Sequence, residues 1–251
     1  MANTVTNPTG PHQPELSLVM PCYNEAVGLE ATLNAWMLSI RDRIGSFEIL
    51  VINDGSSDGS GRILDRIRRD NRELRVFHQL NVGHGRAVRR GYELSRGRFV
   101  AQVDLNGRYE ISDFFRLWDL RDSFSLVLGH RTHRIDSWAR RGASRINRRA
   151  IQWLFNVQMT DPEVPFRIMR NDVLKDLLLR VPPSQEITNL ALSVLFKQLG
   201  EGAVAEVPIP FRFRPFGRDR QGLLSTVSST TQVVTSLINL RLKSKPPVIA
   251  S

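Results

Sequence analysis

The sequence has few cysteines and no long apolar runs, and both absences narrow the class of protein. The one cysteine, Cys22, excludes internal disulfides and cysteine-based zinc clusters and fits a reducing compartment. Because Cys22 lies inside an apolar segment, we expect a buried structural thiol rather than a nucleophile. No run approaches the roughly 18 apolar residues of a membrane-spanning helix. Residues 1–14 are polar and proline-rich, so we expect a disordered leader and a cytoplasmic protein, either soluble or peripheral on the inner face of a membrane.

Acidic residues are fewer than basic ones. The chain has 25 Asp and Glu against 35 Lys and Arg, a formal net charge of +10, which favours an anionic partner. That partner would be nucleic acid, an anionic membrane surface or a phosphorylated substrate. The arginines are not interleaved with stacking aromatic residues and no nucleic-acid motif is present, so we do not expect nucleic acid. The sequence indicates no protein partner.

Short apolar runs alternate with amphipathic segments, which predicts a right-handed βαβ progression. Strands are expected at residues 16–20, 47–52, 74–78, 98–104 and 125–129. Helices are expected at residues 25–43, 58–70, 84–95, 111–121 and 137–157. Further on, the order is less regular, with strands at the sequences FRIM and AVAEVPI and helices near 171–180 and 186–199. We predict a single Rossmann-like α/β domain over residues 15–221, with a mostly parallel central sheet flanked by helices.

Residues 222–251 are expected to form an amphipathic helix and a tail. The helical periodicity places Leu223, Val227, Val234 and Ile238 on its apolar face. Two interpretations stay open. The helix docks on its own domain, or it lies on a membrane surface with its basic residues near anionic lipid, namely Arg241, Lys243 and Lys245.

Two of the predicted strands end in polar loops, LSLVMPCYNE and FEILVINDGSSDGS. In open α/β sheets, ligands bind beyond the carboxyl ends of the strands, where these loops lie side by side. Glu25 and Asp54 are therefore the first candidates to contact a nucleotide.

A third run, FVAQVDLN, acquires polar residues as its strand ends. Because strand side chains alternate, Gln102, Asp104 and Asn106 are expected on one side. Their oxygens suit Mg²⁺ or Mn²⁺ held jointly with the phosphates of a substrate, although one carboxylate alone binds such a metal weakly. The alternative is that Asp104 only caps the following turn.

Together with LNVGHGRAVRRGYELSRGRFVAQVDLN and EVPIPFRFRPFGRDR, the segments SLVMPCYNE and ILVINDGSSDGS resemble, in order and spacing, family 2 glycosyltransferases with the A-type (GT-A) nucleotide-sugar fold. The resemblance is strongest to dolichol-phosphate mannose synthases and related polyprenyl-phosphate glycosyltransferases. It implies a nucleotide-sugar donor and a divalent metal as cofactor. It also implies that the nucleotide pocket is lined by Pro21, Tyr23, Glu25, Asp54 and, in the glycine-rich loop, Gly85.

The chain departs from the family pattern at the metal. Asp104 matches the second acid of the D-x-D motif, but Gln102 replaces the first, and His84 stands where lysine is usual. We therefore expect a weakened metal site, partly replaced by basic side chains. The resemblance implies that Arg214 and Arg220 belong to a mobile loop closing over the donor pyrophosphate.

For the acceptor, the resemblance implies a phosphate site of Arg131, Arg141 and Ser144, and hence a polyprenyl phosphate. The loop that carries TSGFR in the family reads EVPFR here, with Arg167 retained. The expected function is inverting transfer of a sugar to a polyprenyl phosphate, with Asp104, Arg131, Arg214 and Arg220 as the catalytic residues. Two alternatives remain: a hydroxyl acceptor, near which Glu186 would lie, or a catalytically weak nucleotide-binding relative.

Overall fold

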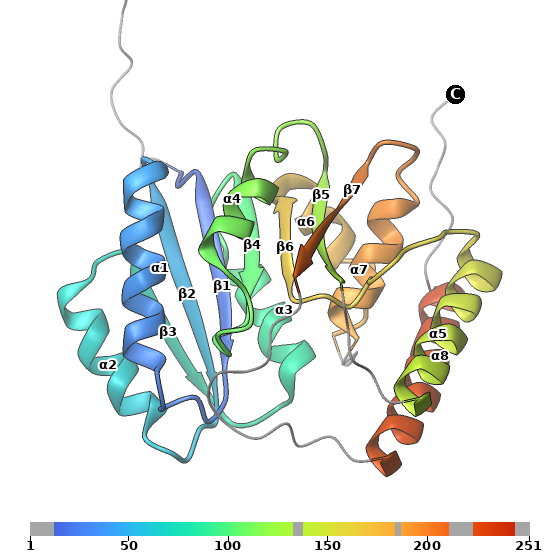
Figure 1. Ribbon diagram of the computed structural model, residues 1–251, viewed down its shortest axis with the longest axis horizontal. Helices are drawn as coiled ribbons and strands as arrows, with labels where there is room; N and C mark the ends of the chain where they lie inside the picture. The colour runs from blue at the N-terminus through green and yellow to red at the C-terminus, as the bar shows by residue number, and fades with distance from the viewer. Residues whose placement is uncertain (1–12, 133–137, 184–186, 211–222, 244–251) are drawn as a thin grey trace, which may run out of the picture.

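The computed structural model describes residues 13–132, 138–183, 187–210 and 223–243. Within them, seven strands form one sheet in the order β3-β2-β1-β4-β6-β5-β7. The strands are β1 (Leu16–Cys22), β2 (Phe47–Asp54), β3 (Leu74–Gln79), β4 (Phe99–Val103), β5 (Leu126–Thr132), β6 (Phe166–Arg170) and β7 (Val204–Pro210). The predicted α/β class with a mostly parallel sheet is confirmed (Figure 1).

The helices of the described residues connect and flank these strands. They are α1 (Leu29–Arg43), α2 (Ser60–Asp70), α3 (His84–Leu94), α4 (Ile111–Trp118), α5 (Trp138–Phe155), α6 (Asn171–Leu178), α7 (Thr188–Lys197) and α8 (Leu223–Lys243). Helices α3, α6 and α7 pack on one another on one face, whereas α1 and α4 cover the other, where Trp36 meets Phe114 edge to face at 5.4 Å (Figure 1). The central strands are thus buried on both faces, as their apolar runs require.

One strand runs against the others. β6 pairs antiparallel with both β4 and β5, whereas the remaining pairs are parallel. The short FRIM run indicated a strand but not its direction, because direction depends on the connections that lead into it. As a result, the start of β6 lies beside the end of β4, with Phe166 opposite Val103. The loop that precedes β6 is therefore brought to the edge of the sheet where β4 ends.

The first helix begins later than predicted. Sequence periodicity suggested a start at residue 25, but α1 begins at Leu29 after Gly28, which has a left-handed backbone with φ of 79°. Residues 24–26 are held as a loop by backbone hydrogen bonds to the side chains of Ser56, Asp58 and Ser60 after β2, and these bonds compete with helix formation. This loop is the first component of the candidate site.

Helices α5 and α8 pack against each other at one end of the molecule (Figure 1). Within the described part of α8, the buried apolar residues are Val233, Leu237 and Leu240. The predicted apolar face was therefore wrong in register: Ile238, assigned to it, is 43% exposed. The packing on α5 favours the interpretation in which α8 docks on its own chain. None of the helices in the described ranges combines the length and apolar composition that crossing a membrane requires.

Candidate active site

The loops after β1 and β2 are tied together at the carboxyl edge of the sheet. The backbone N–H of Asn24 donates to Ser56 Oγ at 3.0 Å, that of Glu25 donates to Ser60 Oγ at 3.0 Å, and that of Ala26 donates to Asp58 Oδ2 at 2.8 Å. These bonds fix the two strand ends side by side, as predicted. They thus hold together the two loops expected to line a nucleotide pocket.

Asp54, at the end of β2, is buried and anchors the glycine-rich loop. Its Oδ1 accepts hydrogen bonds from Gln79 Nε2 at 2.7 Å and from the Val82 N–H at 2.9 Å, and its Oδ2 accepts one from the Gly83 N–H at 3.0 Å. Three donors satisfy the hydrogen-bonding capacity that a buried carboxylate has to fill. Asp54 thus shapes the loop that leads into α3, whether or not it also contacts a base or ribose.

Gln102 is fully buried on β4, and its amide is turned toward α3. The Tyr92 hydroxyl donates to Gln102 Oε1 at 2.6 Å, whereas Gln102 Nε2 has no hydrogen-bond partner. The amide oxygen that was predicted as a metal ligand is therefore engaged by Tyr92. Burial raises the pKa of the Tyr92 hydroxyl, so it remains a donor at neutral pH.

Asp104 follows β4 and is the carboxylate at the centre of the site. Its Oδ2 lies 3.4 Å from Asn106 Nδ2, whereas its Oδ1 is buried and has no hydrogen-bond partner. Burial raises the pKa of Asp104, and the neighbouring His84, Gln102 and Arg131 act in the opposite direction. A buried carboxylate oxygen without a donor is costly, and a bound cation would compensate it.

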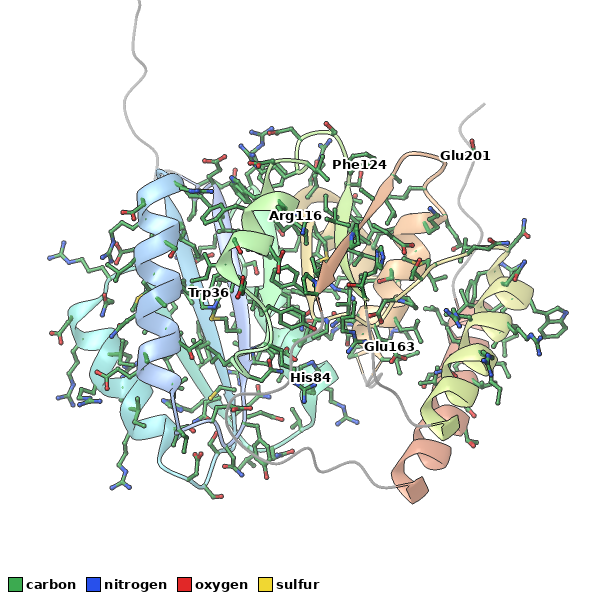
Figure 2. The ribbon with its side chains drawn as sticks, viewed as in Figure 1. Trp36, His84, Arg116, Phe124, Glu163 and Glu201 are labelled. Atoms are coloured by element: carbon green, nitrogen blue, oxygen red, sulfur yellow. The ribbon has the colours of Figure 1, made fainter. Side chains whose placement is uncertain are left out.

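The nearest imidazole to this oxygen comes from the glycine-rich loop. His84 Nε2, at the start of α3, lies 3.9 Å from Asp104 Oδ1. That distance is too long for a hydrogen bond. Neighbouring ligands that each lie about 2.1 Å from one divalent cation are separated by roughly 3.0–3.4 Å, so the pair would share a metal ion after the exposed His84 side chain moves closer by about 0.5–1 Å. Figure 2 shows His84 at the lower edge of the sheet, with Glu163 along the same edge.

Arg131, at the end of β5, is paired with an acid that the sequence reasoning had not assigned. Its Nε and Nη2 donate to Asp161 Oδ2 and Oδ1 at 2.6 and 2.8 Å, and both side chains are largely buried. Burial disfavours the guanidinium charge, but the bidentate bond to Asp161 outweighs it and raises the pKa of Arg131. Arg131 is thus a fixed cation, close enough to Asp104 to lower its pKa.

Arg167 on β6 holds the loop that carries Asp161. Its guanidinium is 1% exposed and donates to the carbonyl oxygens of Pro162, Val164 and Asn189 and to Ser193 Oγ. The family resemblance marked this arginine as retained near the acceptor. In the structure it contacts backbone rather than the open edge, which makes it a positioning residue for the loop.

The other predicted site residues fall into two groups. Pro21 is buried at the end of β1, Tyr23 is 51% exposed beyond it, and Gly85 is buried with its carbonyl accepting from the Thr188 hydroxyl. The second group lies outside the described residues or has side chains that are not described: Arg141 and Ser144 on α5, Glu186, Arg214 and Arg220. The structure brings together the first group with Asp104 and Arg131 at one edge of the sheet.

Sequence reasoning missed Tyr92 and Asp161. Tyr92 lies on a helix ten residues before Gln102, and no local pattern links the two. Asp161 lies 30 residues after Arg131 in the turn TDPEVP, and only the pairing of β6 between β4 and β5 brings the two together. The unusual density of turn residues around Asp161 was the one available signal.

Comparisons with known proteins identify the family of the chain. The model of glycosyl transferase family 2 matches residues 17–178, more than half of the chain. An undecaprenyl-phosphate 4-deoxy-4-formamido-L-arabinose transferase of Edwardsiella ictaluri is 29% identical over 231 residues, 91% of this chain and 69% of that protein. A dolichyl-phosphate beta-glucosyltransferase of Dictyostelium discoideum is 32% identical over 135 residues, 49% of this chain and 41% of that protein.

Solved structures show the same fold. Glucosyl-3-phosphoglycerate synthase from Mycobacterium tuberculosis, in complex with Mn²⁺, UDP-glucose and phosphoglyceric acid, superposes with a TM-score of 0.65. The alignment covers 92% of this chain and 81% of that chain at 18% identity. The chain belongs to glycosyltransferase family 2 and has the GT-A fold. It is a glycosyltransferase, and the predicted resemblance is confirmed.

Proposed function

We propose that the protein transfers a sugar from a nucleotide-sugar donor to a polyprenyl phosphate, with inversion at the anomeric carbon, while bound to the cytoplasmic face of a membrane. The observation that carries the proposal is the placement of Asp104 and Arg131. A buried carboxylate oxygen without a hydrogen-bond partner, suited to the donor side, lies at the same edge as a fixed guanidinium, suited to an acceptor phosphate. The undecaprenyl-phosphate and dolichyl-phosphate transferases among the relatives support this acceptor class.

The donor side is formed by the strand-end loops and by Asp104. The unpaired Oδ1 of Asp104 and the nearby His84 imidazole fit a divalent cation, Mg²⁺ or Mn²⁺. Such a cation neutralises the charge that develops on a nucleoside diphosphate leaving group. Gln102 and Asn106 contribute less, because the Gln102 oxygen accepts from Tyr92 and the Asn106 oxygen accepts from the Arg108 N–H at 3.2 Å. The site therefore offers one carboxylate where a D-x-D motif offers two.

The acceptor side needs orientation rather than a base. A phosphate monoester has a second pKa near 6, so a polyprenyl phosphate is already a nucleophile at neutral pH. An oxygen of that phosphate attacks the anomeric carbon from the face opposite the nucleoside diphosphate, which leaves with the bonding electron pair. Arg131 orients the acceptor phosphate by charge, and Asp161 keeps the guanidinium in place.

A turnover assay tests this function. The protein is incubated with UDP- and GDP-sugars, Mg²⁺ or Mn²⁺, and either undecaprenyl phosphate or the matching polyprenol, and release of nucleoside diphosphate is measured. We expect turnover with the phosphate alone and a product of inverted configuration by NMR. Equal transfer to the polyprenol would contradict the phosphate acceptor, and retention would contradict direct displacement.

Variants test the two sides of the site separately. Asp104→Asn removes the open carboxylate charge and is expected to lower kcat by about 10²-fold or more, as for loss of one electrostatic group in a transition state. His84→Ala is expected to weaken Mn²⁺ binding in the presence of UDP, measured by calorimetry. His78→Ala is the matched control, because His78 pairs with Asp65 and Asn53 away from Asp104. Equal Mn²⁺ affinity of the two histidine variants would remove His84 from the proposed ligands.

A further inference from the structure

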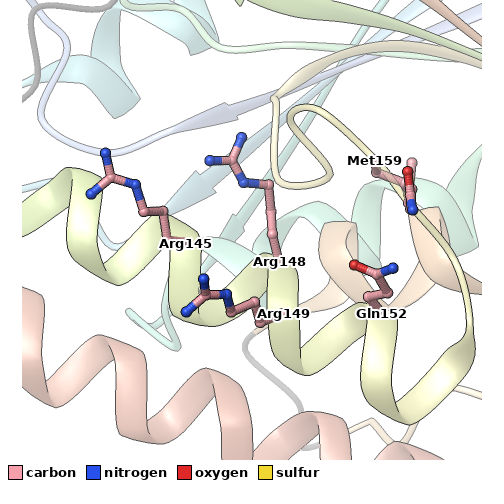
Figure 3. Close-up of a pocket in the computed structure, with 6 residues that line it drawn as sticks. Arg145, Arg148, Arg149, Gln152 and Met159 are labelled. Atoms are coloured by element: carbon pink, nitrogen blue, oxygen red, sulfur yellow. The ribbon is translucent and has the colours of Figure 1, made fainter.

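Helix α5 carries a second basic feature, separate from the strand-end edge. A cavity of about 310 Å³ is lined by the side chains of α5 and of the segment that follows it: Arg145, Arg148, Arg149, Gln152, Gln158 and Met159. Figure 3 shows Arg145 and Arg148 projecting to the same side of the helix, with Met159 beyond them on the returning chain. Among the described residues, the lining contains three guanidinium groups and two amides and no carboxylate.

The three arginines are exposed, and no ion pair joins them to any carboxylate in the described part of the chain. Arg145 lies three and four residues before Arg148 and Arg149, so their charges face one another along the helix and repel. A phosphate group relieves that repulsion and matches the planar donor geometry of guanidinium. The cavity is therefore suited to an anion with several oxygen acceptors.

Two large apolar side chains lie beside these arginines. Trp153 is 85% exposed and Ile146 is 54% exposed, and their separation of seven residues places them on one stripe of α5. Arg149 lies between them, three residues after Ile146 and four before Trp153. The opposite side of α5 is occupied, since Ile151 and Phe155 are buried. Exposed tryptophan next to arginine is typical of helices that lie in a membrane interface.

We propose that the Arg145–Arg148–Arg149 cavity binds phosphodiester headgroups of an anionic bilayer, with Trp153 and Ile146 entering the interfacial layer. The membrane contact is thus made by the outward face of α5, not by the apolar face of α8 that the sequence suggested. Arg131 is not among the described residues that line the cavity, and the side chains of Arg141 and Ser144, the other two residues predicted to bind the acceptor phosphate, are not described. Docking is measured without donor or acceptor, so its outcome is independent of the proposed transfer reaction.

The test uses sucrose-loaded phosphatidylcholine vesicles, either without or with phosphatidylglycerol. The anionic vesicles contain about 30 mol% phosphatidylglycerol, so that they resemble an anionic membrane surface. The full chain is expected to sediment with the anionic vesicles and to be released by salt. Tryptophan emission is expected to shift to the blue. In a Trp138→Phe background, Trp153→Phe should abolish the shift, because the two remaining tryptophans, Trp36 and Trp118, are already buried.

The pocket variant is R145Q/R148Q/R149Q. The matched control, R69Q/R72Q/R180Q, removes the same charge from exposed positions on α2, in the turn after α2 and in the turn after α6. Each arginine near the membrane surface is expected to raise the vesicle affinity about fivefold, so the pocket variant should bind roughly 100-fold more weakly. The control should lose far less. Circular dichroism of both variants verifies that α5 still folds.

Three results would overturn the proposal. The first is equal vesicle affinity of the two triple variants, and the second is equal sedimentation with neutral and anionic vesicles. The third is displacement of the protein from vesicles by inorganic phosphate or glycerol phosphate at concentrations too low to change the ionic strength, which would identify a site for a soluble phosphate compound.

Discussion

Replacement of Gln102 by aspartate would restore the acidic pair of the family motif in a fully buried position. Side chains two residues apart on a strand are separated by about 6.6 Å. At an effective dielectric constant of about 20, two carboxylates at that distance repel by about 2.5 kcal/mol. Asp104 already has one buried oxygen without a hydrogen-bond partner, and Arg131, the fixed cation of the site, is already paired with Asp161. We therefore expect Gln102→Asp to destabilise the metal-free protein.

The matched control is Gln102→Asn. Asparagine has the same size as aspartate, and this variant loses the same hydrogen bond from Tyr92 without adding a charge. In a chelating buffer at pH 8, the Asp variant should melt about 5–10 °C below the Asn variant, since 1 kcal/mol corresponds to about 2–4 °C at this chain length. The difference should shrink as the pH falls toward 5, because protonation of either carboxyl removes the repulsion. Differential scanning calorimetry measures both.

A divalent cation should reverse the order of the two variants. With Mn²⁺ and UDP, the Asp variant gains a second carboxylate ligand and should be stabilised more than the Asn variant. Equal melting temperatures of the two variants in chelator would refute the electrostatic argument. Equal stabilisation by Mn²⁺ would refute the placement of the metal beside position 102.

Three further predictions concern stability. Arg167→Met should cost about 3–5 kcal/mol in urea unfolding, because several buried carbonyl acceptors lose a charged donor. Gly91→Ala should cost about 1–3 kcal/mol, since the new Cβ would lie 2.2 Å from Val19 Cγ1 and force α3 away from β1. Desolvation opposes ionisation of Asp58, but bonds from the Ser60 hydroxyl and from three backbone N–H groups outweigh it and lower its pKa. That stabilisation is present above about pH 4 and is lost as the pH falls through the lowered pKa of Asp58. In Asp58→Asn, the free energy of unfolding should therefore fall less steeply below about pH 4.

The first two of these variants have matched controls. Arg167→Lys keeps the charge but not the planar fork, and recovery of full stability would show that charge alone suffices. Gly45→Ala adds the same atom where nothing lies within 4 Å and should be nearly neutral. Equal losses at both glycines would contradict a packing explanation. An unchanged acid limb in Asp58→Asn would contradict the linkage argument.

The amino-acid sequence alone determined the fold class, the order of the strands and helices, and the two strand-end loops. These features follow from local patterns, namely short apolar runs that end in turn residues, alternating with amphipathic helices. Ordered motifs added the family, and the family model confirmed it. Cys22 was correctly predicted as a buried thiol, and burial raises its pKa to about 12.

The tertiary structure alone decided the contacts between residues far apart in the chain. The pairing of Arg131 with Asp161 depends on β6 entering the sheet antiparallel, and the contact of Tyr92 with Gln102 depends on how α3 lies across β4. The same holds for α5 and α8, since periodicity indicated an amphipathic helix but not which stripe would find a partner. Local patterns fix which side chains share a face, whereas packing decides which face is covered and which remains open to a ligand.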